Sequence, residues 1–388
     1  MMAPSFRPPR RFHTVLASVA AVALVLWGCS KNPLSSVESP ESPVQITQGL
    51  DAAGGAILSA ENPRVREVMA IQDRHTPDLM KLAGVVGVGT GMDAAGNAVI
   101  KVFSERKLPP GLLKQTLDGV TVVEEVTGRI VAYKGGPGGG GGGGYTAKQT
   151  PPIQLGCSGG PAGDLANGYC CGGTLGSLVS KGGNLYILSN SHVFAGDVVN
   201  GGNGSTSSIG DDISQPGLID ANCSAANANL VADLSSLSTL YPPNSTPNVD
   251  AAIAQVRPGQ VRTDGAILGI GTISSSTVGA SINQGVKKSG RTTGTTRSKV
   301  SALNATINVG YSTECAGSSF TKQFTGQIVC SNSGSKFLNS GDSGSLMVED
   351  VTTNPRAVGL LYAGSSTSAI ANPIGHVLSH LNATMVGN

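Results

Sequence analysis

A run of glycines constrains the fold of this chain more than any other feature of its sequence. The segment GGPGGGGGGG occupies residues 135–144. Glycine has no side chain to bury and loses more conformational freedom on folding than any other residue, so such a run forms a flexible linker and not part of a core. We therefore expect a linker over residues 135–150, which separates a small domain at 59–134 from a larger one at 151–388.

The first residues have the pattern of a targeting segment. Three arginines precede the apolar run TVLASVAAVALVLWG, which ends beside Cys29. The sequence LWGC resembles the lipobox of bacterial lipoproteins, which implies a signal peptide over residues 1–28 and lipidation of Cys29. An uncleaved membrane anchor is the alternative. Both interpretations predict a protein of the bacterial cell envelope outside the cytoplasm, with the Ser- and Pro-rich residues 29–58 as a flexible tether.

Composition favours an exported all-β protein and argues against nucleic acid as a partner. The 388 residues include 26 basic and 24 acidic side chains, and only 13% of the residues are charged. No basic patch stands out, whereas nucleic-acid-binding domains concentrate Lys and Arg on one face. The 55 glycines and the low charge are typical of a chain rich in short strands and turns.

Short apolar runs broken by Gly, Ser and Asn recur through the larger domain and predict a barrel or sandwich of β-strands. Examples are NLYILSN, DAAIAQV, QIVC, GSLMVED and AVGLLYAG. Near the end of the chain, Asn372-Pro373 begins a predicted amphipathic helix. The small domain is predicted to be α+β, because Asn62-Pro63 is typical of a helix start and three strand-like runs follow it: GVVGVGTG, NAVIKVF and GVTVVEEVTGRIVAY.

Six cysteines follow Cys29, and an even number in an exported chain predicts disulfides. Six cysteines allow 15 connectivities, of which a Cys315–Cys330 bond is favoured because these residues flank one probable hairpin. A metal site is the weaker alternative, since Cys170-Cys171 lacks the C-x-x-C spacing and the helical His376 and His380 lack the glutamate of H-E-x-x-H. We expect neither a metal nor another cofactor.

The segment SGDSGSLMV, residues 340–348, contains the candidate for a nucleophile, Ser343. A serine hydroxyl needs a neighbouring base and an acid that orients the base. His192 directly follows an apolar strand in YILSNSHVFAG, and Asp250 opens the strand-like NVDAAIAQV. The alternative is that the Gly-, Asp- and Ser-rich stretch is only a turn.

The three motifs, in the order His192, Asp250 and Ser343, resemble those of the chymotrypsin-fold serine proteases. The resemblance covers about residues 151–388. It implies two six-stranded β-barrels with the active site between them, and a C-terminal helix. It also implies that the oxyanion of the reaction is met by the backbone N–H groups of Gly341 and Ser343.

Two further resemblances concern the branch of the family. KKSGRTTGTT, residues 287–296, resembles a segment of the alpha-lytic branch of bacterial serine proteases, which implies an ion pair between Arg291 and Asp342. A surface arginine in a turn is the alternative. The run from LAGVVGVGTG to AVGLLYAGS resembles bacterial relatives of plant narrow-leaf-type trypsin-like proteins, which implies that the small domain belongs with the protease unit.

Substrate specificity is expected to differ from that of trypsin. Phe337 lies six residues before Ser343, where trypsins carry the aspartate that selects basic residues, so we expect cleavage after small or apolar residues. The run LLYAG, residues 360–364, is the expected edge strand for the backbone of a protein or peptide substrate, with Tyr362 and Gly364 at the pocket.

The sequence therefore predicts a serine endopeptidase with an acyl-enzyme mechanism. A catalytically silent binding module and an esterase on the same fold are the alternatives. The role of the small domain stays open among a folding aid, a latency domain and a fixed substrate-binding partner. The oligomeric state stays open as well.

Overall fold

The computed structural model describes residues 49–50, 56–132, 143–166, 169–196, 207–246, 248–311 and 319–388. The predicted signal peptide with Cys29, most of the predicted tether and residues 133–142 of the linker region lie outside the described residues. Residues 46–388 form one compact unit. Within the described ranges, no helix has both the length and the apolar character needed to cross a membrane.

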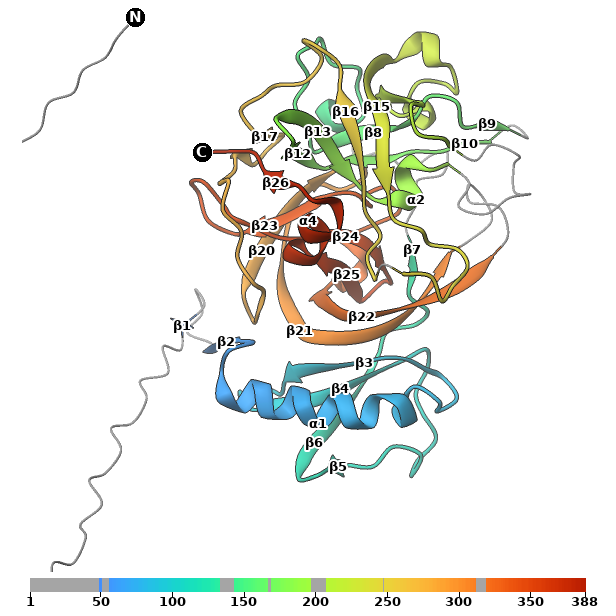
Figure 1. Cartoon of the computed structure of the whole chain (residues 1–388). Coiled ribbons are helices and arrows are strands. Elements are labelled where there is room, and N and C mark those ends of the chain that lie inside the picture. Colours follow the sequence, from blue (N-terminus) through green and yellow to red (C-terminus); the bar gives the residue numbers. More distant parts are fainter. Residues whose placement is uncertain are drawn as a thin grey trace, which may run out of the picture. The chain divides into compact units, whose positions relative to one another are not determined.

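Two large sheets, in which most strand pairs are antiparallel, build the main body, in agreement with the mainly β fold class predicted above (Figure 1). The first has eight strands in the order β11-β8-β14-β15-β16-β13-β12-β26, and it contains the strands that carry the predicted base and acid. Its strands are β8 (Cys157–Pro161), β11 (Gly173–Leu175), β12 (Ser177–Lys181), β13 (Asn184–Ser189), β14 (Asp212–Gln215), β15 (Asn229–Leu237), β16 (Ala252–Val256) and β26 (Thr384–Met385).

The second sheet contains a ring of six strands paired in the order β20-β23-β24-β25-β22-β21, and β21 pairs back with β20. This pairing closes a barrel, but β24 continues past Leu360, where its pairing with β23 ends, and β21 continues past Lys299, where its pairing with β20 ends. The strands are β20 (Gly285–Gly290), β21 (Gly294–Tyr311), β22 (Phe320–Ser331), β23 (Leu346–Glu349), β24 (Ala357–Gly364) and β25 (Ser368–Pro373). The loop with the predicted nucleophile lies directly before β23.

The small N-terminal region shares a sheet with this barrel. Strand β21 is 18 residues long, and beyond the ring it pairs with β3, so that the sheet continues β21-β3-β4-β6-β5. The added strands are β3 (Val85–Met92), β4 (Ala98–Ser104), β5 (Thr116–Leu117) and β6 (Val120–Val126). The backbone hydrogen bonds between β21 and β3 therefore tie the N-terminal region directly to the barrel.

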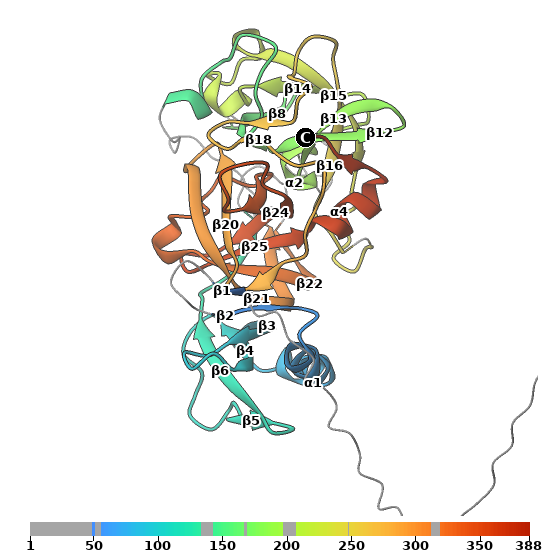
Figure 2. The same cartoon turned by 90° about the vertical axis from the view of Figure 1, so that its left-hand side faces the viewer.

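Helix α1 (Pro63–Leu79) covers the N-terminal strands (Figure 2). Asn62 caps it, since its side-chain oxygen accepts from the N–H of Arg64 at 2.9 Å, and Pro63 occupies the first turn, where its missing N–H costs nothing. The helix buries Val65 and Val68 among other apolar residues. The helix start predicted at Asn62-Pro63 is confirmed.

The remaining elements are short. Helix α4 (Ile374–Leu381) lies beside β24 and β25 and buries Ile374, Val377 and Leu381, which confirms the predicted C-terminal helix. Helix α2 (Ser191–Phe194) follows β13. The other strands are β1 (Gly49–Leu50), β2 (Ala56–Ser59), β7 (Val131–Ala132), β9 (Leu165–Ala166), β10 (Tyr169–Cys170), β17 (Ala266–Ile267), β18 (Gly271–Thr272) and β19 (Ser281–Ile282), and the 3₁₀ turns are Gly143–Tyr145, Leu218–Asp220, Ala225–Asn227 and Ser333–Ser335.

The cysteines pair differently from the prediction. Cys170 and Cys223 form a disulfide, and Cys171 is disulfide-bonded as well. Cys330 is a free thiol, fully buried on β22 with its Sγ 3.5 Å from the sulfur of Met347. The predicted Cys315–Cys330 bond is therefore wrong, because Cys330 points into the barrel core; Cys315 itself lies outside the described residues.

Candidate active site

The predicted base and acid meet between two strands of the eight-stranded sheet. His192 lies in α2, directly after β13, and Asp250 lies directly before β16, which pairs with β13. The Nδ1 atom of His192 is 2.6 Å from Oδ2 of Asp250, and the backbone N–H of His192 donates to Oδ1 at 3.2 Å. An ionised carboxylate only accepts, so Nδ1 carries the proton and Nε2 is left as the basic nitrogen.

Both groups of this pair are buried. Asp250 is 0% and His192 1% exposed. The backbone N–H of Asp250 donates to the side chain of Asn372 at 3.0 Å, and the side-chain amide of Asn190 donates to the Asp250 carbonyl at 2.7 Å. The pair is therefore fixed from three directions, as required of an acid that orients a histidine ring.

Tyr311 is a third partner of the acid, and the sequence did not reveal it. Its hydroxyl donates to Oδ2 of Asp250 at 2.9 Å, the same oxygen that receives His192. The ring stacks on Phe320 with 4.8 Å between centroids and meets the His192 ring edge-on at 5.9 Å. Burial, and then the negative charge of Asp250, raises the pKa of Tyr311 well above its usual value, so the phenol stays protonated and donates.

Ser343 lies in the turn between Asn339 and β23, and it is fully buried. Its Oγ donates to the carbonyl of Tyr362 on β24 at 3.0 Å. Nε2 of His192 is buried and, within the described part of the chain, has no hydrogen-bond partner. The structure therefore forms the His192–Asp250 half of the predicted triad and holds the serine hydroxyl on a different acceptor.

The turn around Ser343 has the backbone that an oxyanion hole needs. Gly341 and Gly344 have φ values of +94° and +92°, which L side chains rarely adopt. Among the hydrogen bonds of the described residues, none uses the backbone N–H of Gly341 or of Ser343. These two donors, predicted for the oxyanion, remain available.

The predicted substrate strand β24 is already paired. Strand β7, which follows the N-terminal domain, runs antiparallel to it with Val131 opposite Gly364 and Ala132 opposite Ala363. β7 also runs parallel to β21, where the N–H of Gly310 donates to the Ile130 carbonyl at 2.9 Å. The chain itself thus occupies the edge that a substrate backbone would need.

The predicted pocket residues Tyr362 and Phe337 are both buried. Tyr362 is buried, and its ring packs against Phe324 with 5.0 Å between centroids. Phe337 is 3% exposed and belongs to the apolar core, while its backbone N–H donates to the side chain of Asn332 at 3.0 Å. Phe337 is therefore in part a core residue.

The predicted ion pair between Arg291 and Asp342 is replaced by two other pairs. Arg291 donates through Nε and Nη2 to the two carboxylate oxygens of Asp220, at 2.6 and 2.8 Å. Asp342 instead has Lys288 of β20 as its cation, 3.3 Å from Oδ2. Asp220 presents both of its carboxylate oxygens to the planar guanidinium of Arg291. A two-point contact of this kind is stronger than a contact with one oxygen.

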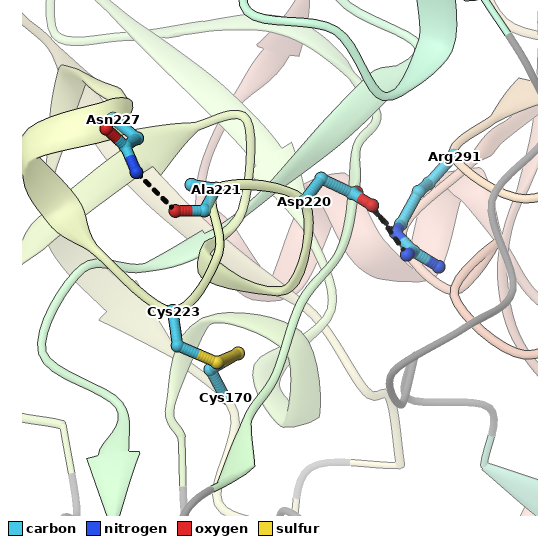
Figure 3. The surroundings of a disulfide bond; sticks show 6 residues. All are labelled: Cys170, Asp220, Ala221, Cys223, Asn227 and Arg291. Carbon is cyan, nitrogen blue, oxygen red and sulfur yellow. Dashed lines mark hydrogen bonds and ion pairs between the residues drawn. A yellow bond between two sulfur atoms is a disulfide. The ribbon is translucent and has the colours of Figure 1, made fainter.

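Arg291 thereby connects the turn between β20 and β21 to a disulfide-bonded loop. Figure 3 shows Asp220 with its carboxylate directed at Arg291, three residues before Cys223, which is bonded to Cys170. The side-chain amide of Asn227 donates to the Ala221 carbonyl at 3.0 Å and closes the same loop. Arg291 is 1% exposed, so the alternative of a surface arginine is wrong.

Comparison with known proteins gives structural likeness only. No protein-family model matches the chain, and no curated protein does. Similar solved structures include a glutamic acid specific serine protease that uses a histidine triad in substrate binding (20% identity, 60% of this chain and 100% of that one, TM-score 0.39). Thermobifida fusca protease A is 17% identical over 61% of this chain and 99% of its own, with a TM-score of 0.39. An alpha-lytic protease homologue, N4, is 20% identical over 55% and 92%, with a TM-score of 0.35.

These neighbours are bacterial serine proteases, but likeness at such TM-scores carries no conclusion about activity. The class of fold rests on the strand pairings: a mainly β, chymotrypsin-like arrangement of a closed six-stranded ring beside a second antiparallel sheet, with a C-terminal helix.

Proposed function

We propose that this chain is a serine endopeptidase in which Ser343 is the nucleophile, His192 the general base and Asp250 the acid that orients the histidine. The observation that carries the proposal is the buried 2.6 Å contact between His192 Nδ1 and Asp250 Oδ2, which leaves Nε2 free to accept a proton. A buried His–carboxylate pair and a serine in a Gly-flanked turn are the parts that acyl transfer needs.

The proposed reaction begins at the serine hydroxyl. Ser343 Oγ leaves the Tyr362 carbonyl, donates its proton to His192 Nε2 and attacks the scissile carbonyl carbon. The resulting oxyanion accepts hydrogen bonds from the N–H groups of Gly341 and Ser343. The histidine then gives its proton to the leaving amine, and water repeats the sequence on the acyl-enzyme.

Binding of a substrate also requires that β7 leave β24. The backbone groups of Ala363 and Gly364 are paired with Ala132 and Val131, so the described state is a closed one. We propose that the N-terminal region acts as a latency domain in this state. Val131 and Ala132 are small or medium apolar residues, which accords with the proposed preference for cleavage after small or apolar side chains.

The same closed geometry favours a second candidate, a catalytically silent binding module. In that case Ser343 would stay on the Tyr362 carbonyl. We further propose, from the sequence alone, that Cys29 is lipidated and holds the protein in the cell envelope outside the cytoplasm.

The test is covalent labelling with a fluorophosphonate, followed by mass spectrometry of the intact protein and its peptides. If the chain is a serine protease, one adduct forms on Ser343. Ser343→Ala abolishes the adduct, and His192→Ala strongly lowers the rate at which it forms. Full-length protein that folds but never labels, even after β7 is weakened as described in the Discussion, would favour the silent module.

A further inference from the structure

The turn that carries Ser343 is anchored by a buried carboxylate, in addition to hydrogen bonds from Thr174 to the carbonyls of Gly341 and Ser343. Oδ1 of Asp342 accepts from the backbone N–H groups of Thr292 and Thr293 at 2.9 and 3.1 Å. Oδ2 accepts from the Thr293 hydroxyl at 2.7 Å and from the N–H of Asn339 at 2.9 Å. Asp342 therefore joins the β20–β21 turn to the nucleophile turn, and its charge needs a partner because the residue is 0% exposed.

That partner is Lys288, whose side chain is also 0% exposed. Its Nζ lies 3.3 Å from Asp342 Oδ2, donates to the Gly294 carbonyl at 3.0 Å and donates to the hydroxyl of Thr293. An ammonium group has three N–H donors, and three acceptors meet it here. The site is thus built for a lysine.

Two other cationic side chains near Lys288 bind acceptors other than Asp342. Arg291 is bound to Asp220 through two hydrogen bonds. Lys287, the neighbour of Lys288 on β20, points the other way and donates to the Val351 carbonyl at 2.6 Å. Among the described groups, Asp342 is the charged one that acts on Lys288, and Thr293 and Gly294 supply neutral oxygens.

We infer that Lys288 is the positioning residue of the nucleophile turn: through Asp342 it holds the N–H groups of Gly341 and Ser343 in place for the oxyanion. This inference rests on the proposed serine protease function. It gives Asp342 a buried cation from within the chain, and this cation is not Arg291.

A lysine in this role makes catalysis sensitive to alkaline pH. Burial lowers the pKa of Lys288, and the charge of Asp342 opposes part of that shift. When the ammonium loses its proton, Asp342 is left without a counter-charge and the turn loosens. Activity therefore falls with rising pH through a drop in kcat, whereas an arginine would keep its charge.

Stability depends on the protonation of Lys288 with the opposite sign to activity. A loss of activity caused by mispositioning can therefore be told apart from one caused by unfolding. Because the pKa of Lys288 is lower in the folded than in the unfolded chain, the unfolded chain binds more protons between these two values. Stability from this group therefore rises with pH in that window, while activity falls.

The experiment compares Lys288→Met and Lys288→Arg with the matched control Lys287→Met, all in the full chain. We expect Lys288→Met to lower kcat about 10²-fold, comparable with the loss of one oxyanion donor, with little change in KM. The wild type and Lys287→Met should lose activity at alkaline pH, and Lys288→Arg should lose this alkaline decline whatever its absolute rate.

Hydrogen exchange of a peptide covering residues 339–346 provides a readout that needs no activity. Faster exchange in Lys288→Met than in Lys287→Met is expected. An alkaline decline that persists in Lys288→Arg, or equal exchange in the two Met variants, would overturn the inference. If the wild type never labels with fluorophosphonate, the proposed function fails by that result alone, and the exchange data still decide the role of Lys288.

Discussion

Release of β7 from β24 offers a quantitative test of the closed state. Ile130, the residue before β7, is 2% exposed and packs in a cluster with Tyr362, Phe324 and Val309. Truncation of a buried isoleucine to alanine costs roughly 2–5 kcal/mol. If the Ile130 side chain is buried only in the closed state, Ile130→Ala lowers the free energy of opening by up to that amount.

The expected magnitude follows from the same number. A loss of about 2 kcal/mol raises the open fraction roughly 30-fold, because each 1.4 kcal/mol is a factor of ten. With the closed state dominant, the rate at which Ser343 is labelled by a fluorophosphonate is proportional to the open fraction. We therefore expect Ile130→Ala to label at least ten times faster than the wild type.

Two variants serve as controls. Val126→Ala, at the end of β6, changes a residue that is 44% exposed and should leave the labelling rate within about twofold. Ile307→Ala truncates a fully buried isoleucine of the same cluster on β21, and it lowers the thermal midpoint while leaving Ile130 and the residues of β7 unchanged. If Ile130→Ala lowers the midpoint as Ile307→Ala does but labels no faster, β7 does not gate the site.

Three further variants probe the surroundings of the pair and of Ser343. Tyr311→Phe removes one donor to Asp250 Oδ2, so the acid holds the His192 ring less firmly and we expect a lower kcat with little change in KM; an unchanged kcat would contradict this. Arg291→Lys keeps the charge but loses the two-point contact with Asp220. We expect the free energy of unfolding, measured in urea, to fall by about 1–3 kcal/mol. An unchanged free energy of unfolding would contradict the importance of the two-point contact. The double variant Cys170→Ala/Cys223→Ala should lower the free energy of unfolding, measured in urea, by about 2–4 kcal/mol. The control is Cys330→Ala, which removes a free cysteine and no disulfide.

Local patterns predicted several elements correctly. Asn62-Pro63 begins α1 because an Asn cap and a proline in the first turn both act on the residues next to them. The short apolar runs in NLYILSN and DAAIAQV form strands β13 and β16, and the pairing of these strands brings His192 and Asp250 together. The sequence motifs therefore identified two side chains that the structure places in contact.

The partners of charged and sulfur-containing side chains were not predictable in this way. Arg291 was expected to pair with Asp342 and pairs with Asp220, 71 positions away in the sequence, because the fold places that carboxylate in reach of the whole guanidinium. Cys330 was expected in a disulfide and is a free thiol, since its strand turns it into the barrel. Which carboxylate pairs with which cation depends on their positions in the fold. Sequence motifs show only which charged residues are present.

The sequence by itself determined several of the strands, the helices α1 and α4 and the residue types of the candidate site, because periodicity, capping and turn chemistry depend on neighbours along the chain. Only the tertiary structure decided that Tyr311 donates to Asp250, that Lys288 neutralises Asp342 and that β7 lies on β24. Each of these contacts joins segments that are distant in sequence, and strand pairing and burial select them after the local elements have formed.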